Sequence, residues 1–194
     1  DAKSYFHSSI QERGVIIPNP INGNLPDRYQ GEKNKTIVTA CRLHPQKNLN
    51  MLINAFSKLV KEFPDYQLII YGQGVLEEQL RAQVKSLNLE KSVLLPGFTN
   101  DILEKEATAT MYVSSSDFEG ISNAMLEAMG LGLPVVVTDC PVGGARMVIK
   151  DHENGILIPV GDTEAMYRGM KEVLSDDNLR KTLSANAYKV RERF

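Results

Sequence analysis

The chain has 194 residues, of which 42% are hydrophobic and 24% charged, a composition typical of one globular domain with a substantial core. Its 22 basic and 24 acidic residues leave a net charge of -2, which excludes a global basic field of the kind that binds nucleic acid. No apolar run approaches the roughly 18 residues of a membrane-spanning helix, and the polar start at Asp1 lacks the layout of a signal peptide.

The elements expected along the chain alternate between strands and helices. Residues 15–26 combine the apolar triplet Val15–Ile17 with prolines and turn residues, and we interpret this segment as a connector. Helical spacing of apolar residues marks two helices, and a closing segment is expected to form one or two more; these lie in residues 48–63, 76–87 and 162–194. Short apolar strand candidates occupy residues 36–40, 67–71, 93–95, 110–113, 134–137 and 155–158.

This βαβ alternation predicts the fold class. Strands that are apolar on both faces and separated by helices indicate a parallel sheet that is covered on both sides. We therefore expect an α/β fold with a doubly wound, Rossmann-like parallel sheet. Ligands of such sheets bind beyond the carboxyl ends of the strands, so the loops that follow the strands are the expected location of a site.

The loop after the first strand carries two cations, Arg42 and Lys47, on either side of a turn. A guanidinium fork and an ammonium point charge together suit an anionic ligand such as a phosphate. Ordinary solvated surface charges are the alternative interpretation. His44 lies between them next to Pro45 and is expected to be exposed and passive.

The loop that follows residues 110–113 contains Glu119 and Gly120, and we expect a helix to begin near Ile121 or Ser122. The free backbone N–H groups at a helix start favour an anion, so this loop is a second candidate phosphate contact. The alternative for Glu119 is an acid that is favoured near a helix N-terminus by the macrodipole.

Glu127 lies in an otherwise apolar segment, where a buried carboxylate must be hydrogen-bonded or paired. On one continuous helix, Glu119 and Glu127 would lie roughly 12 Å apart along the axis, which suits two ends of an extended ligand. The same spacing is too wide for the two carboxylates of a glycoside hydrolase. A salt bridge from Glu127 to a basic residue at the edge of the core is the alternative.

Other candidates are weaker. The glycines of residues 72–74 lack the third glycine of a dinucleotide fingerprint and are interpreted as turn geometry, as are Gly143 and Gly144. Cys41 and Cys140 are far apart, so we expect reduced thiols of a cytosolic protein, with a disulfide as the less favoured alternative. No cluster with metal-ligand spacing is present, so no metal is expected.

Taken together, these segments resemble the donor-binding half of the retaining glycosyltransferases of family four, also called glycosyltransferases group 1. Residues 15–21 resemble the junction into the second domain of that family, and Arg42 and Lys47 with the following helix resemble its phosphate-binding turn. Residues 71–74 resemble its second strand and loop, and residues 154–162 its closing motif. Residues 119–136 carry its most specific signature, two glutamates separated by seven residues.

The resemblance implies the C-terminal half of a GT-B enzyme, with residues 1–20 as an interdomain connector or a remnant of the N-terminal domain and residues 21–194 as the nucleotide-sugar-binding domain. By that resemblance, Arg42 and Lys47 hold the donor diphosphate, Glu127 binds the ribose, and Glu119 acts in catalysis with both cations. The base is expected near Leu95 to Thr99. The remaining donor contacts implied for the sugar and phosphate are Gly120, Ile121, Ser122 and Asn123.

The family transfers a sugar from a nucleotide-diphosphate donor to an acceptor hydroxyl with retention and without an obligatory metal or cofactor. A UDP-sugar is the expected donor, and surface polysaccharide or glycolipid synthesis the expected setting. The expected partner is a glycan or lipid-linked acceptor bound through a missing N-terminal domain, in the cytoplasm or at the inner face of the membrane. The alternatives are a non-catalytic nucleotide-binding or interaction module, and a nucleotide-sugar epimerase or glycogen-synthase-like enzyme of the same architecture.

Overall fold

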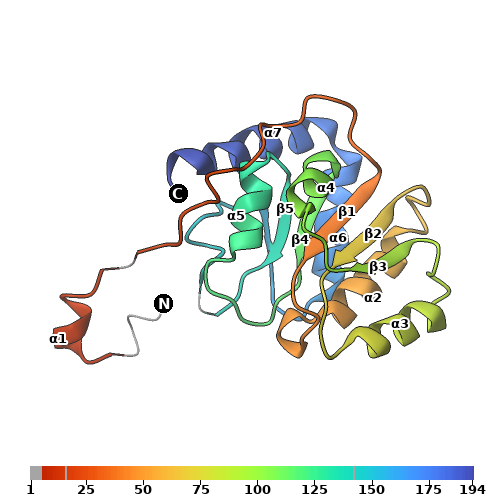
Figure 1. The fold of residues 1–194 in the computed structure, drawn as a ribbon, viewed down its shortest axis with the longest axis horizontal. Coiled ribbons are helices and arrows are strands. Elements are labelled where there is room, and N and C mark those ends of the chain that lie inside the picture. Colours follow the sequence, from red (N-terminus) through yellow and green to blue (C-terminus); the bar gives the residue numbers. More distant parts are fainter. Residues whose placement is uncertain (1–5, 16, 142) are drawn as a thin grey trace.

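The computed structural model describes residues 6–15, 17–141 and 143–194. A single six-stranded parallel sheet runs through the molecule in the order β3-β2-β1-β4-β5-β6 (Figure 1). The strands are β1 (Thr36–Ala40), β2 (Gln67–Tyr71), β3 (Val93–Gly97), β4 (Met111–Ser114), β5 (Val135–Thr138) and β6 (Ile156–Ile158). The expected α/β doubly wound sheet is confirmed.

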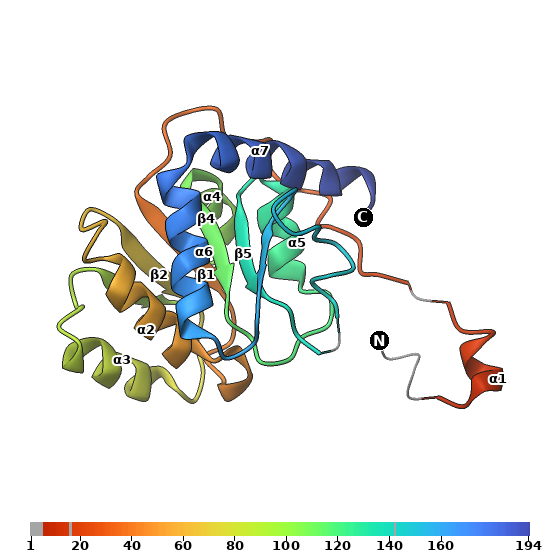
Figure 2. The same ribbon diagram turned by 180° about the vertical axis from the view of Figure 1, so that it is seen from behind.

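Helices cover both faces of the sheet. They are α1 (Ser8–Gln11), η2 (Pro45–Lys47), α2 (Leu49–Leu59), α3 (Glu77–Ser86), α4 (Ile102–Thr108), α5 (Asn123–Gly130), α6 (Thr163–Ser175), α7 (Asp177–Tyr188) and η3 (Lys189–Glu192). Buried residues of α2, α3 and α6 pack on one face, and those of α4 and α5 on the other. In Figure 1 the helices α4 and α5 face the viewer, and in Figure 2, the view from behind, α2 and α6 do.

The alternation of side chains along each strand explains the two layers. In β4, Met111 and Val113 belong to the core beneath α2 and α6, whereas Tyr112 belongs to the core beneath α5. Neighbouring β5 divides in the same way, with Val136 on one side and Val135 on the other. Both faces are therefore dry, as parallel sheets require.

The predicted element bounds differ from the observed ones at a few ends. Strands β1 and β2 match, but β4 and β5 each lie one residue later than predicted. For β5 the reason is Pro134, which has no N–H to donate to the sheet. Helix α2 ends at Leu59 instead of Phe63, which precedes a proline. The helix expected near Ile121 or Ser122 begins at Asn123.

The segment interpreted as a connector extends away from the sheet (Figure 1). Val15 and Ile17 are 82% and 85% exposed and belong to no strand, while Ile16 lies outside the described residues. Among the described residues, hydrogen bonding to the folded unit begins at Asn19, whose Nδ2 donates to Asn123 Oδ1 at 3.0 Å. Ile21 N then donates to the carbonyl of Phe194 at 3.1 Å.

Candidate functional site

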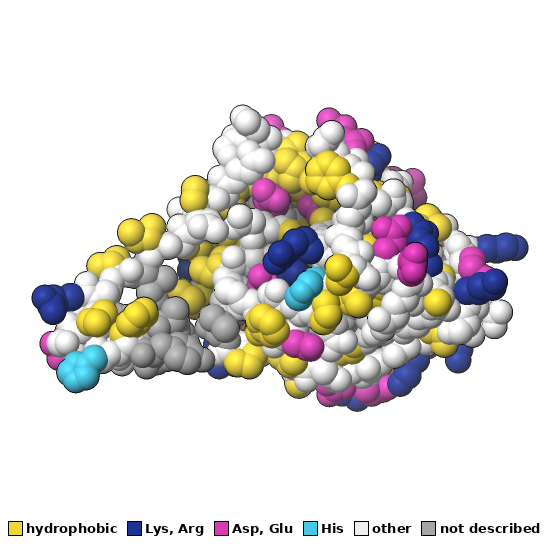
Figure 3. Space-filling model, turned by 60° about the horizontal axis from the view of Figure 1, so that its bottom comes forward, with side chains coloured by type: hydrophobic (Ala, Val, Ile, Leu, Met, Phe, Trp, Pro, Cys, Tyr) yellow, Lys and Arg dark blue, Asp and Glu magenta, His cyan; other side chains and the backbone are white. Residues whose placement is uncertain are grey.

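The sheet has a topological switch point between β1 and β4, where successive strands begin to be added on the other side of β1. The chain builds β1, β2 and β3 outward in one direction, and then returns to place β4 on the other side of β1. The loops that leave the carboxyl ends of β1 and β4 diverge at such a point and leave a crevice where ligands of doubly wound sheets bind. Figure 3 shows this edge, where basic and acidic side chains lie side by side near the middle of the face.

An ion pair joins these two loops, because Lys47 Nζ donates to Glu119 Oε2. The side chains of Lys47 and Glu119 are only 15% and 26% exposed. Ser116 Oγ also donates to Glu119 Oε2, at 3.3 Å. The structure thus brings together two of the predicted catalytic residues, 72 residues apart in sequence, in a partly dry environment where charges interact more strongly than in water.

Hydrogen bonds between side chain and backbone hold the two loops in register. Ser115 Oγ donates to the carbonyl of Lys47 at 2.7 Å, and Gln46 Nε2 donates to the carbonyl of Phe118 at 2.7 Å. Asn48 Nδ2 donates to Asp117 Oδ1, also at 2.7 Å. The position of Lys47 is therefore set by the β4 loop as much as by its own.

Local sequence explains the turn that presents Lys47. His44 caps η2 by accepting from Gln46 N at 3.4 Å, so its role is structural, in line with the passive role expected of it. Asn48 has φ 43°, in the left-handed region that asparagine tolerates better than most residues, and caps α2 by accepting from Met51 N. A three-residue 3-10 turn thus runs directly into α2.

Arg42 is exposed and lies at the rim of a cavity of about 340 Å³ between the loops after β1, β2 and β3. The cavity wall is mostly apolar, and Phe98 and Thr99 from the loop after β3 contribute to it. Its lining residues are Ala40, Cys41, Arg42, Tyr71, Gly72, Gln73, Phe98, Thr99 and Ile102. The cavity therefore suits a ligand with a flat ring, and Arg42 places a positive charge beside that ring.

Gly72 does more than the simple turn expected of it. Its φ is +129°, and a Cβ at this position would lie 1.9 Å from the carbonyl oxygen of Cys41. A Cβ at Gly74 would lie 2.4 Å from the carbonyl oxygen of Leu43. The loop after β2 therefore packs backbone to backbone against the loop that carries Arg42, which forms one wall of the cavity.

Leu95 does not line this cavity. Its side chain is buried in β3 and faces a separate cavity of about 380 Å³, and its carbonyl accepts from Arg81 Nη2 at 2.7 Å. Within the range of residues 95–99 expected for a base, the structure brings only Phe98 and Thr99 beside Arg42. The kink at Gly97, with φ +88°, separates these two environments.

The start of α5 lies beside the ion pair. Ser122 caps the helix by accepting from Met125 N, and Gly120 has open space around it. A Cβ at Gly144 would lie 2.0 Å from the carbonyl oxygen of Gly120, so the loop after β5 touches this backbone directly. Because α5 begins at Asn123, Glu119 is a loop residue and the 12 Å helical separation from Glu127 does not apply.

Glu127 is half-buried on α5, and burial raises the pKa of its carboxyl above the ordinary value. Among the described residues no hydrogen bond or ion pair to its side chain is present, so the salt bridge that the sequence left as the alternative is not formed, and the carboxylate is less buried than expected. The reason is its partial exposure, since water reaches the carboxylate and a protein partner is not required. Glu127 is therefore free to accept from a ligand.

The fully buried acid is instead Glu106 on α4, which sequence reasoning missed. Its side chain is 1% exposed, and its Oε1 has no hydrogen-bond partner in the described part of the chain. Burial, and then the charge of Glu127, raise the pKa of Glu106 to about 8. Helical spacing from Leu103 offered a signal, because a residue three positions later lies on the same helix face.

The described ranges hold neither a group of metal ligands nor a membrane-spanning helix. There, the His, Cys, Asp and Glu side chains form no group of three or more that could hold a metal ion. No helix within these ranges is long and apolar enough to cross a bilayer.

Known proteins resemble this chain over most of its length. It is 39% identical over 155 residues to the N-acetylgalactosamine-N,N'-diacetylbacillosaminyl-diphospho-undecaprenol 4-alpha-N-acetylgalactosaminyltransferase of Campylobacter jejuni, covering 80% of this chain and 41% of the relative. It is 31% identical over 190 residues to the poly(glycerol-phosphate) alpha-glucosyltransferase of Bacillus subtilis, covering 96% of this chain and 28% of the relative. The chain thus spans less than half the length of either enzyme.

A solved structure supports the same relationship. The pneumococcal O-GlcNAc transferase GtfA, crystallised in complex with UDP and GlcNAc, superposes with a TM-score of 0.82 at 29% identity, covering 93% of this chain and 36% of that one. The sequence pattern of the family described as "Glycosyl transferases group 1" matches residues 26–190, which include both loops of the site. On these grounds the chain belongs to the glycosyl transferases group 1 family, with the Rossmann-like fold of the GT-B C-terminal domain.

Proposed function

We propose that this chain is the donor-binding domain of a retaining, family-four glycosyltransferase that transfers a sugar from a nucleotide-diphosphate sugar, with a UDP-sugar as the donor. The observation that carries the proposal is the Lys47–Glu119 pair at the crevice between the β1 and β4 loops, beside a mostly apolar cavity rimmed by Arg42. The relatives support it, since the C. jejuni and B. subtilis proteins are named as sugar transferases.

Each part of the donor has a matching part of the site. The base enters the cavity of about 340 Å³ beside Phe98, and the diphosphate lies between Arg42, Lys47 and the start of α5. Glu127, which has no protein partner among the described residues, accepts from the ribose hydroxyls. Glu119 faces the sugar, with Gly120 to Asn123 alongside.

The chemistry follows from the leaving group. When the bond between sugar and phosphate breaks, negative charge grows on the diphosphate, and Arg42, Lys47 and the backbone N–H groups that begin α5 are already in place to stabilise it. Removing one such donor typically costs about 3 to 4 kcal/mol of activation free energy in other enzymes. No metal is part of this proposal.

Residues 21–194 form the donor domain in this proposal, and residues 1–20 are a connector to an acceptor-binding domain in the rest of a longer protein. The acceptor is a glycan or a lipid-linked sugar, and the setting is surface polysaccharide or glycolipid synthesis at the cytoplasmic side of a membrane. The relatives' names, which contain diphospho-undecaprenol and poly(glycerol-phosphate), support this class of acceptor.

Calorimetry with UDP and GDP on this chain tests donor binding directly. We expect saturable heat from one of them, with UDP preferred, and an increase in melting temperature because a ligand that binds only the folded state stabilises it. Lys47→Ala should weaken that binding by about tenfold, since a hydrogen bond between charged groups is lost. Lys61→Ala, which removes an exposed lysine outside the site, is the matched control.

Absence of saturable heat from both nucleotides would count against the donor site. In the complete enzyme, Lys47→Ala should lower turnover by at least about tenfold, because the developing charge on the leaving group loses a donor. An unchanged turnover in Lys47→Ala would remove this lysine from the mechanism. Binding without any turnover in the complete protein would instead favour a non-catalytic module.

A further inference from the structure

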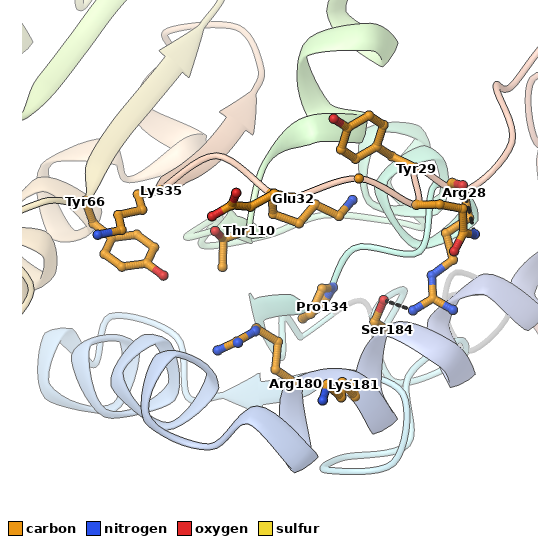
Figure 4. A pocket seen from close by; sticks show the side chains of 13 residues that line it. Arg28, Tyr29, Glu32, Lys35, Tyr66, Thr110, Pro134, Arg180, Lys181 and Ser184 are labelled. Carbon is orange, nitrogen blue, oxygen red and sulfur yellow. Dashed lines mark hydrogen bonds between the residues drawn. The ribbon is translucent and has the colours of Figure 1, made fainter.

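A second cavity, of about 460 Å³, lies at the opposite edge of the sheet from the donor site. Thr110 and Pro134, which directly precede β4 and β5, form part of its wall, and Tyr66 precedes β2. Residues 28–35 cross above it and α7 lies below it (Figure 4). Its size lies within the range of about 300 to 1,000 Å³ that is typical of ligand pockets.

The wall of this cavity is strongly basic, although the chain as a whole carries a net charge of -2. Five basic side chains line it against one acidic side chain, Glu32; the basic residues are Arg28, Lys33, Lys35, Arg180 and Lys181. Lys35 pairs with Asp65 at 2.9 Å and Arg180 with Asp177 at 2.5 Å. Neither acid lines the cavity, and the other three basic residues form no ion pair within the described part of the chain.

Two of these three cations are held in place by neutral partners. Arg28 Nη2 donates to Ser184 Oγ at 2.9 Å, and Ser184 Oγ in turn donates to the carbonyl of Gly132. Lys33 Nζ donates to the carbonyl of Ala107 at 2.5 Å. Both side chains are half-buried, so their rotamers are restricted before any ligand arrives.

The closeness of these cations is unfavourable in the absence of an anion. Burial, and then the positive charge of Arg28, lower the pKa of the Lys33 amine to about 8. A nearby negative charge would oppose both effects, because its attraction favours the protonated amine and offsets the repulsion from the guanidinium. The arrangement is thus complementary to an anion held between a guanidinium fork and an ammonium group.

We propose that this cavity binds a phosphate-bearing anion, held by Arg28, Lys33 and Lys181. Arg28 lies on the crossing segment and Lys181 on α7 (Figure 4), and Lys33 lines the cavity from the crossing segment as well. The phosphate belongs either to a soluble phosphorylated compound or to the headgroup of an anionic lipid, since the same three groups recognise both. The site is separate from the donor crevice, which lies at the carboxyl ends of the strands.

Titration of the labelled chain with inorganic phosphate, followed by the amide resonances of Lys33, Thr110 and Ser184, tests the site. We expect saturable shifts at these residues and an upward shift of the Lys33 pKa when phosphate is bound. Lys33→Gln and Lys181→Gln should each weaken binding by about tenfold, whereas Lys61→Gln, with the same change in net charge, should not. Lys47→Ala should leave these shifts unchanged, which separates this cavity from the donor site.

A vesicle assay distinguishes the two sources of phosphate. Co-sedimentation with phosphatidylglycerol vesicles but not with phosphatidylcholine vesicles, lost in Lys33→Gln, would assign the site to a lipid headgroup. Saturable phosphate binding without vesicle binding would assign it to a soluble compound. The proposal is overturned if phosphate leaves the three amides unperturbed and the phosphatidylglycerol vesicles bind no protein, or if Lys33→Gln and Lys181→Gln bind phosphate as the unmodified chain does.

Discussion

At the scale of single residues, the acids around α5 differ more in environment than their sequence suggests. Glu119 is paired with Lys47, Glu127 is half-buried without a protein partner among the described residues, and Glu106 is buried with an unpartnered oxygen. The three carboxyls thus lie in three different environments. Of the two without an ion pair, Glu127 is the partly exposed one, so it can accept hydrogen bonds from a ligand.

Glu106 should make stability depend on pH. The folded chain keeps the Glu106 proton up to about pH 8, whereas an unfolded chain releases it above about pH 4.5. The free energy of unfolding should therefore fall between these values as pH rises, by up to about 1.4 kcal/mol per pH unit. Glu106→Gln should reduce this slope and be more stable than the unmodified chain at pH 8, as measured by urea denaturation from pH 5 to 8.

Glu104→Gln is the matched control, because Glu104 is an exposed acid on the same helix. Glu127 also has a raised pKa and contributes a slope of the same sign, so the comparison rests on the difference between variants. Equal slopes in Glu106→Gln and the unmodified chain would show that Glu106 is not neutral in the folded state.

Glu119 should weaken the binding of the diphosphate even though it takes part in sugar transfer. Its carboxylate accepts a hydrogen bond from Lys47 Nζ, so a bound diphosphate competes with Glu119 for that ammonium group. Glu119→Gln should therefore bind UDP more tightly, by severalfold or about 1 kcal/mol, while turnover of the complete enzyme falls. Calorimetry at low and moderate salt measures the affinity of Glu119→Gln for UDP. Weaker binding than in the unmodified chain, which is the result expected for Lys47→Ala, would refute this prediction.

At the scale of elements, the site depends on loops that touch backbone to backbone. The β2 loop meets the β1 loop at Gly72, and the β5 loop meets the β4 loop at Gly144. A side chain at either point would push a carbonyl aside. The glycines therefore set how closely the loops at the carboxyl edge approach one another, and with it the shape of the crevice.

Gly144→Ala should displace the Gly120 backbone beside the start of α5. The new Cβ would lie 2.0 Å from the Gly120 oxygen, and overpacking of this kind costs about 1 to 3 kcal/mol. We expect a lower melting temperature together with weaker UDP binding. Gly23→Ala is the control, because a Cβ there meets no atom within 4 Å; equal melting temperatures for the two variants would show that the close approach has no energetic weight.

At the scale of the whole molecule, the folded unit begins near Ile21. Ile21 and Leu25 pack against the core beneath α5, and Arg191 donates to the carbonyls of Leu25 and Pro26. Ahead of Ile21, the described residues make few contacts with the sheet and its helices. We therefore propose the boundary that was expected from the sequence, with residues 1–20 outside the donor domain.

Removal of residues 1–20 should change the free energy of unfolding by no more than about 0.5 kcal/mol, because the described side chains among them are mostly exposed. Removal of residues 1–28 should destabilise by about 2 kcal/mol or more, since it deletes Ile21, Leu25 and the Arg28–Ser184 hydrogen bond. Denaturant unfolding measures both. A large loss in the shorter deletion would place the boundary earlier in the chain.

Much of the architecture was predictable because each helix and strand depends on the pattern of apolar residues in its own segment. The bounds of β1 and β2 follow from short apolar runs, and the helix that contains Phe56 follows from 3.6-residue spacing. The errors lie at ends, where single groups decide, such as the missing N–H of Pro134 and the capping hydroxyl of Ser122. Local rules specify elements well and their termini less well.

Sequence alone determined the layer order, the edge of the sheet that carries the loops, and the candidates Arg42, Lys47, Glu119 and Glu127, because these depend on residue type and on spacing along the chain. Only the tertiary structure decided that Lys47 pairs with Glu119, that Phe98 and not Leu95 stands beside Arg42, and that Glu106 is the buried acid. These features arise where distant segments meet, and burial, pairing and pKa are properties of that meeting and not of either segment.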